Sequence, residues 1–281
     1  MQKIIFVTGK GGVGKSTYAA ALAQKYANQG KKTLLVELGD QSFYQEFFSL
    51  LEVGYQPLKV AENLDIALWS GAECLKEYAL YLLKSQVLYK LFFENRVSKS
   101  LIQVAPALPE LAILGKITSE PRHHGPAPHN EVLVIDAYST GHFLALLQAP
   151  KGMAEIIKFG PMGEQSRSIF QTIKNPNICE YHVVTLAEEL PFVEGMELMN
   201  SIEEAVKIKP RLIFNKIVKT ILSSKDLNAN ESGFQTYLKS ILANQETYLQ
   251  QSQTDGIDFL EMPLLSISKA KDLTQKLAEV L

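Results

Sequence analysis

A glycine-rich run near the start of the chain carries the residue types that bind phosphate. Gly9 is followed after four residues by Gly14–Ser16, which matches the pattern G-x-x-x-x-G-K-[ST]. Glycines permit positive φ, so several backbone N–H groups can converge on phosphate oxygens. In such a loop the Lys15 ammonium reaches the β- and γ-phosphates and the Ser16 hydroxyl is a ligand of Mg²⁺. The candidate phosphate-binding residues are Gly9, Lys10, Gly11, Gly12, Val13, Gly14, Lys15, Ser16 and Thr17.

A carboxylate at the end of an apolar run is suited to hold the metal ion. Asp136 comes directly after 132–135, and this run reads Val-Leu-Val-Ile. An acidic residue that ends a buried strand is the arrangement in which a carboxylate holds Mg²⁺ through water. ATP and Mg²⁺ are therefore the cofactors that the sequence predicts.

The elements that must position these groups are strands separated by helices. The strand-like runs are 4–7, 33–36, 64–68, 132–135, 183–186, 211–214 and 257–260, and several are apolar on both faces, as buried parallel strands are. The phosphate loop follows the first run and opens a helix that Gly30 is well placed to end. This alternation predicts an α/β fold, with a mostly parallel sheet flanked by helices.

The whole chain, 1–281, is expected to form a single ATPase domain with one elaboration and one loop. From about 41 to 116, after the second strand, helical spacing dominates, so a helical subdomain that carries partner specificity is expected. Its apolar residues either line a client groove or simply pack the subdomain: Leu82, Leu83, Leu91, Phe92 and Phe93. Residues 119–130 are rich in Pro, Gly and polar types and hold three of the five histidines, which predicts a surface loop rather than a metal site.

Composition narrows the class of protein. The 281 residues have a formal net charge of -2, which leaves no global attraction to nucleic acid or anionic lipid. The first apolar run is too short for a signal peptide, and no stretch is apolar enough to span a membrane. We therefore expect a cytoplasmic protein that binds no nucleic acid and meets a membrane only through a partner. Cys74 and Cys179 are far apart in the sequence, so neither a disulfide framework nor a zinc site is indicated.

The second lysine of the phosphate loop carries a family resemblance. The run 10–17, Lys-Gly-Gly-Val-Gly-Lys-Ser-Thr, resembles the deviant Walker A motif of dimeric ATPases that include ParA/MinD-type proteins, nitrogenase iron protein and the ArsA group. The resemblance implies that Lys10 crosses a dimer interface to the nucleotide of the opposite subunit. A cation that arrives there would stabilise charge on the transferring phosphoryl group. A homodimer, or a heterodimer with a related ATPase chain, is expected.

Residues 136–150 resemble the switch II segment of the ArsA branch. The matching positions are Asp136, Thr140, Gly141, His142, Leu144, Leu146, Leu147 and Pro150, whereas Ser139 replaces a proline and Ala145 an arginine. The resemblance implies that Thr140 and Gly141 contact the γ-phosphate. It also implies that Asn215 reads the adenine edge, with turn formation as the alternative, and that Pro263 belongs to the last loop on the nucleotide side.

The segment after the second strand departs from the family. Where the ArsA group has an aspartate that positions the attacking water, this chain has Gly39. Asp40 would take that role if the loop is shifted by one residue, and Glu37 could approach Mg²⁺. The cysteines that bind zinc or arsenite in relatives are missing, so neither client is carried over.

The favoured hypothesis is therefore an ATP-hydrolysing dimeric switch that couples its nucleotide state to an unidentified client or partner protein. The alternatives are a positioning ATPase of the ParA/MinD type and a nucleotide-binding regulatory subunit with weak hydrolysis.

Overall fold

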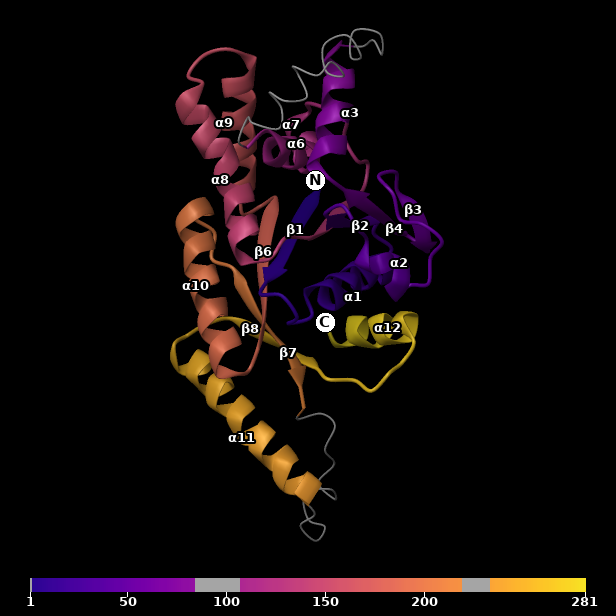
Figure 1. The fold of residues 1–281 in the computed structure, drawn as a ribbon, viewed down its shortest axis with the longest axis vertical. Coiled ribbons are helices and arrows are strands. Elements are labelled where there is room, and N and C mark those ends of the chain that lie inside the picture. The colour runs from indigo at the N-terminus through magenta and orange to yellow at the C-terminus, as the bar shows by residue number, and fades with distance from the viewer. Residues whose placement is uncertain (1, 84–106, 219–232) are drawn as a thin grey trace.

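The computed structural model of the protein describes residues 2–83, 107–218 and 233–281. In these ranges the chain forms three layers, with one eight-stranded sheet between two layers of helices (Figure 1). The strand order is β3-β4-β2-β5-β1-β6-β7-β8, and each neighbouring pair is parallel except β3 and β4. The predicted α/β fold with a mostly parallel sheet is confirmed.

Six of the seven predicted runs lie within strands, and the seventh, 257–260, overlaps β8, which begins at Phe259. Their bounds are β1 Lys3–Gly9, β2 Thr33–Leu38, β3 Leu58–Ala61, β4 Leu64–Trp69, β5 Val132–Asp136, β6 Cys179–Leu186, β7 Arg211–Ile217 and β8 Phe259–Pro263. The sequence pattern did not indicate β3, because this antiparallel edge strand exposes Leu58 and Lys59 and has no doubly buried apolar run.

The helices cover both faces of the sheet. Their bounds are α1 Lys15–Asn28, α2 Phe43–Phe47, α3 Gly71–Leu83, α6 Leu108–Ile117, α7 Ser119–Arg122, α8 Thr140–Ile156, α9 Pro161–Ile173, α10 Glu189–Val206, α11 Gly233–Thr254 and α12 Ala270–Val280. One core lies under α1, α2 and α12, and the other lies under α6, α8, α9, α10 and α11 on the opposite face (Figure 1). Within the described ranges, no helix is long and apolar enough to cross a membrane.

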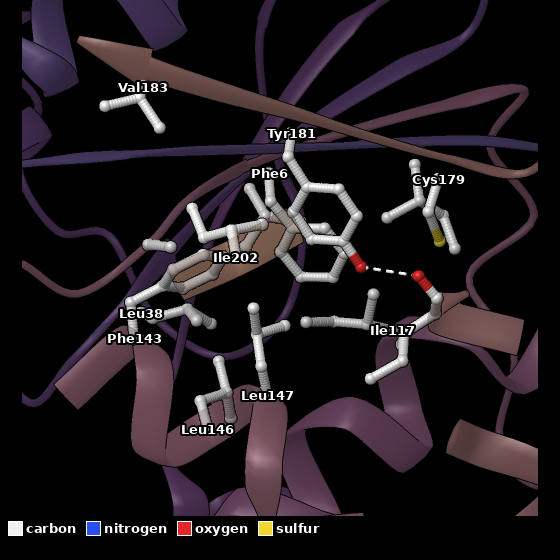
Figure 2. Close-up of a cluster of buried hydrophobic side chains, with 14 of the residues drawn as sticks. Phe6, Leu38, Ile117, Phe143, Leu146, Leu147, Cys179, Tyr181, Val183 and Ile202 are labelled. Carbon is white, nitrogen blue, oxygen red and sulfur yellow. Dashed lines mark hydrogen bonds between the residues drawn. The ribbon is translucent and has the colours of Figure 1, made fainter. Parts of the chain in front are cut away.

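Aromatic side chains fasten α8 and α9 to the centre of the sheet. Phe6 of β1 stacks on Tyr181 of β6 with ring centroids 5.2 Å apart, and Phe143 of α8 packs against both rings (Figure 2). The Tyr181 hydroxyl donates a hydrogen bond of 2.6 Å to the carbonyl oxygen of Ile173. This contact ties the end of α9 to β6.

The region 41–116 contributes both helices and strands. Its described part holds α2, α3 and α6, but β3 and β4 lie between them and extend the central sheet. Leu82 is exposed on α3, whereas Leu91, Phe92 and Phe93 lie outside the described residues.

The segment 119–130 contacts the body of the domain near both of its ends. Its first four residues form α7, in which Ser119 is buried. Near its end, the Gln2 amide donates to the carbonyl oxygens of Pro128 and Asn130 at 3.0 and 2.8 Å.

A lysine with little exposure joins α6 to α3 and β4. The Lys116 side chain is 10% exposed and forms an ion pair with Glu77 of α3. Its Nζ lies 4.7 Å from the ring centroid of Tyr55 and 4.8 Å from that of Trp69 in β4. The Tyr55 hydroxyl donates to Glu77 Oε2 at 2.7 Å. Because the ammonium is paired and surrounded by ring faces, its removal from bulk water is compensated.

Candidate nucleotide-binding site

The phosphate loop connects the end of β1 to the first turn of α1. Gly9, Gly12 and Gly14 have φ values of 146°, 85° and 94°, which L side chains rarely adopt. A Cβ at Gly14 would also lie 2.2 Å from Asn215 Nδ2, whereas one at Gly11 would meet open space. The glycines therefore leave space beside the loop backbone at Gly11 and Gly12. This space lies at the N-terminus of α1, whose positive end favours phosphate binding.

Lys15 folds over the loop that precedes it. Its Nζ donates a hydrogen bond of 3.1 Å to the carbonyl oxygen of Lys10. Burial lowers the pKa of Lys15, while the negative charge of Asp136 acts in the opposite direction. The ammonium is thus held close to both the loop and the Asp136 carboxylate.

Lys10 is bound within its own chain. Its Nζ lies 2.6 Å from each carboxylate oxygen of Glu194 in α10, and the two side chains are 41% and 31% exposed. Leu190 and Val193, on the first turns of the same helix, are exposed apolar residues. Lys10 therefore lies at a partly exposed edge of the loop, in an ion pair with Glu194.

Asp136 ends β5 and is 5% exposed, next to the start of α1. Tyr44 donates its hydroxyl to Asp136 Oδ2 at 3.0 Å and to the carbonyl oxygen of Ser16 at 2.8 Å. Burial raises the pKa of Asp136 to about 6, although hydrogen bonds from Ser16 and Tyr44 act to lower it. The Ser16 hydroxyl and the Asp136 carboxylate lie next to each other, and both offer the oxygen atoms that Mg²⁺ prefers as ligands.

The segment after β2, where the sequence departs from the family, folds back so that Ser42 and Phe43 contact Glu37. One carboxylate oxygen of Glu37 accepts the backbone N–H of Phe43 at 2.7 Å, and the other accepts the Ser42 hydroxyl at 2.6 Å. Burial raises the pKa of Glu37, and these hydrogen bonds oppose the rise. Glu37 therefore holds the start of α2, and its charge also acts to raise the pKa of Asp136, its register partner on β5, so its approach to Mg²⁺ stays a prediction.

Asp40 is exposed and lines a pocket of about 680 Å³ together with its neighbours Gly39 and Gln41. Its charge acts on Tyr138, two residues after Asp136. Burial, and after it the negative charge of Asp40, raises the pKa of Tyr138 to about 12. Asp40 thus lies within electrostatic reach of the segment that follows β5, and the pocket that it lines contains no residue of the phosphate loop.

Thr140 and Gly141 form the first turn of α8 and are partly or fully exposed. The segment before them is tied to β1, because Thr8 Oγ1 donates to the carbonyl oxygen of Tyr138 at 2.8 Å and Ala137 N donates to that of Val7 at 2.9 Å. A second helix N-terminus therefore lies at the same edge of the sheet as the phosphate loop.

Asn215 contacts the phosphate loop, whereas Pro263 lies on a strand farther from it. The buried Asn215 amide donates from Nδ2 to the carbonyl oxygen of Val13 at 2.8 Å, and Oδ1 accepts the N–H of Lys216 at 2.9 Å. Asn215 is thus part of the loop's support. Pro263 ends the edge strand β8, which is separated from β1 by β6 and β7.

Two residues at the site were not assigned roles from the sequence. Glu194 pairs with Lys10 from 184 positions away in the sequence. Tyr44 belongs to an aromatic run, but it contacts a residue 92 positions away. The contact between Tyr44 and Asp136 depends on how the strands are arranged in the sheet, so no local sequence pattern indicates it.

A parallel sheet with a phosphate loop after β1 and an acidic residue at the end of the neighbouring β5 defines a P-loop NTPase. Comparison with known proteins places the chain in one family of this class. A family model described as anion-transporting ATPase, the ArsA type, matches residues 2–162. The protein belongs to this family of nucleotide-binding ATPases.

Individual relatives extend the similarity beyond the matched region. ATPase BagA of Mycobacterium tuberculosis is 30% identical over 233 residues, which cover 80% of this chain and 68% of that protein. A putative arsenical pump-driving ATPase 2 of Aquifex aeolicus is 24% identical over 97% of this chain and 98% of its own length. ATPase ASNA1 homolog 1 of Paramecium tetraurelia is 25% identical over 97% and 94%.

Proposed function

We propose that the chain is a Mg²⁺-dependent ATPase that dimerises around its nucleotides and couples their state to a partner protein. The observation that carries the proposal is the meeting of Lys15, Ser16 and Asp136 at one edge of the sheet, with Lys10 at the open side of the same loop. This arrangement supports phosphate binding in one subunit and a cation that reaches across to a second.

Each group has a role in the proposed site. Lys15 and the loop N–H groups bind the β- and γ-phosphates, and Thr140 and Gly141 sense the γ-phosphate from the start of α8. Ser16 and Asp136 hold Mg²⁺, which when bound supplies positive charge to the phosphate oxygens. Asn215 and Pro263 form the base side of the site. The second donor of the Asn215 amide serves that role, since Nδ2 carries two hydrogens and Val13 takes one.

The proposed client is a protein and not a soft metalloid. Cys74 and Cys179 are both buried, and burial raises the pKa of the Cys74 thiol to about 12 and that of Cys179 still further. Thiolates bind soft ions, whereas buried protonated thiols do not. The name of the Aquifex relative therefore supports only the idea that this ATPase drives a partner.

The terminal helix does not favour the ParA/MinD-type alternative. Leu277 and Ala278 of α12 are buried against the core that contains α1, and Lys25 donates to the carbonyl oxygen of Leu281 at 2.6 Å. A helix whose apolar face is packed in this way has no free face to insert into a membrane surface.

We expect the purified protein to bind ATP and to release phosphate only with Mg²⁺. The rate per chain should rise with protein concentration, because a complete site needs Lys10 of a second subunit. Phosphate release across a hundredfold concentration range, together with light scattering in ATP and in ADP, tests this. A rate per chain that stays constant while the protein remains monomeric would refute the dimeric mechanism.

Asp40 is the proposed water-positioning residue, and Asp40→Asn should slow single-turnover hydrolysis about a hundredfold without weakening ATP binding. The matched control is Glu52→Gln, which removes another carboxylate from the lining of the same pocket and should leave the rate unchanged. Equal rates for Asp40→Asn and the parent would exclude Asp40. If the parent itself hydrolyses no ATP but binds it, the regulatory-subunit alternative is favoured.

A further inference from the structure

We infer that Tyr44 is a positioning residue for the metal side of the nucleotide site. Its hydroxyl fixes the Asp136 carboxylate relative to the first turn of α1, which carries Ser16. The inference rests on the proposed Mg²⁺–ATP site and adds a residue to it. Tyr44 contacts neither metal nor nucleotide in this role, since it acts through Asp136.

The geometry places the Tyr44 hydroxyl between two parts of the site. The side chain is 0% exposed, and its oxygen lies 3.0 Å from Asp136 Oδ2 and 2.8 Å from the Ser16 carbonyl oxygen. One acceptor ends β5 and the other belongs to α1. A hydroxyl carries one proton, so the two acceptors share a single donor, and both must stay within its reach.

The hydroxyl is itself held in place by the anchoring of α2. This helix has only five residues, and its start is fixed by the carboxylate of Glu37, which accepts from Ser42 and from the N–H of Phe43. Ser42 Oγ in turn accepts the N–H of Gln45 at 3.3 Å. The Tyr44 ring stacks on Phe48 with centroids 5.9 Å apart. The segment that departs from the family thus ends in a rigid support for the metal ligand.

The contact is of the kind that preorganises a site. A carboxylate offers about four acceptor positions, so one hydrogen bond to Oδ2 leaves the remainder free for the metal's water ligands. That bond also limits rotation of the Asp136 side chain, which lowers the entropy lost when a metal is bound. A phenylalanine at position 44 would fill almost the same space but would lack the hydroxyl. The two hydrogen bonds of the hydroxyl are therefore what distinguishes tyrosine at this buried position.

The test compares Tyr44→Phe with a control that removes another buried tyrosine hydroxyl. Tyr181→Phe loses a hydrogen bond of 2.6 Å to a carbonyl oxygen in the opposite core, away from the site (Figure 2). Binding of a fluorescent ATP analogue is titrated in Mg²⁺ and in EDTA for the parent and both variants. The readout is the dissociation constant in EDTA divided by the dissociation constant in Mg²⁺. This ratio reports how much the metal strengthens binding, and its measurement requires no turnover.

Tyr44→Phe is expected to reduce this ratio about tenfold, as the loss of one hydrogen bond to a charged ligand implies, and to leave binding in EDTA unchanged. Tyr181→Phe is expected to keep the parental ratio. A parental ratio in Tyr44→Phe, a higher one, or equal losses in Mg²⁺ and EDTA would overturn the inference.

A second variant keeps the test decisive if Tyr44→Phe does not fold. Ser42→Ala removes the hydroxyl that links Glu37 to the start of α2, without touching Asp136. It should lower the same ratio by about threefold, because α2 then holds Tyr44 less firmly, and an unchanged ratio there counts against the inference. If the parent binds the analogue equally in Mg²⁺ and EDTA, the proposed metal site fails as well, which separates the two failures.

Discussion

Lys10→Ala is expected to slow ATP hydrolysis about a thousandfold while changing the dissociation constant for ATP by less than about threefold. A positive charge that reaches the transferring phosphoryl group from a second subunit is typically worth 10³ or more in rate. Binding is spared because Lys15 and the loop N–H groups remain. Single-turnover phosphate release at saturating protein, with equilibrium binding measured in parallel, gives both numbers.

The ion pair of Lys10 with Glu194 provides the matched control. Glu194→Gln removes the same charge pair, with Nζ at 2.6 Å from both oxygens, but keeps the lysine. If Lys10 acts across the interface, Glu194→Gln should hydrolyse ATP at least as fast as the parent, because the lysine is released from its own chain. Unaltered turnover in Lys10→Ala, or an equal loss in both variants, would show that only the local ion pair matters.

Lys116→Ala is expected to lower the free energy of unfolding by about 3 kcal/mol. The change leaves Glu77 without its cation in a largely enclosed place and removes an ammonium that lies over the rings of Tyr55 and Trp69. For a domain of this size, the midpoint of thermal unfolding should fall by about 6–10 °C. Urea unfolding followed by circular dichroism measures the free energy directly.

An exposed ion pair serves as the comparison for Lys116. Lys276 and Glu279 are 60% and 49% exposed and lie 2.9 Å apart on α12. Solvent screens such a pair, so Lys276→Ala should leave the unfolding midpoint unchanged. If the two lysine variants unfold alike, burial and ring contacts are not the source of the stability at Lys116.

Local patterns in the sequence were sufficient for most of the fold. Six of the seven predicted runs lie within strands and the seventh overlaps β8, because parallel strands that are buried on both faces are mostly apolar, and that composition is visible in the sequence alone. The edge strand β3 lacks this signal. Likewise, the sequence did not indicate that the Glu37 carboxylate holds α2, because a helix start takes whichever nearby acceptor the folded chain offers to its backbone N–H groups.

The sequence by itself determined the phosphate loop and the family. Both follow from local properties of the chain, namely the spacing of Gly9, Gly14 and Lys15 and the resemblance of the segment around Gly141 to the ArsA switch II. Only the tertiary structure decided which groups meet at the loop. Strand order places β5 between β2 and β1, which brings Tyr44 to Asp136 and Ser16, and it places β7 beyond β6 on the other side of β1, which brings Asn215 to Val13. Such contacts join residues distant in sequence, and they follow from packing and register, which no spacing within the chain encodes.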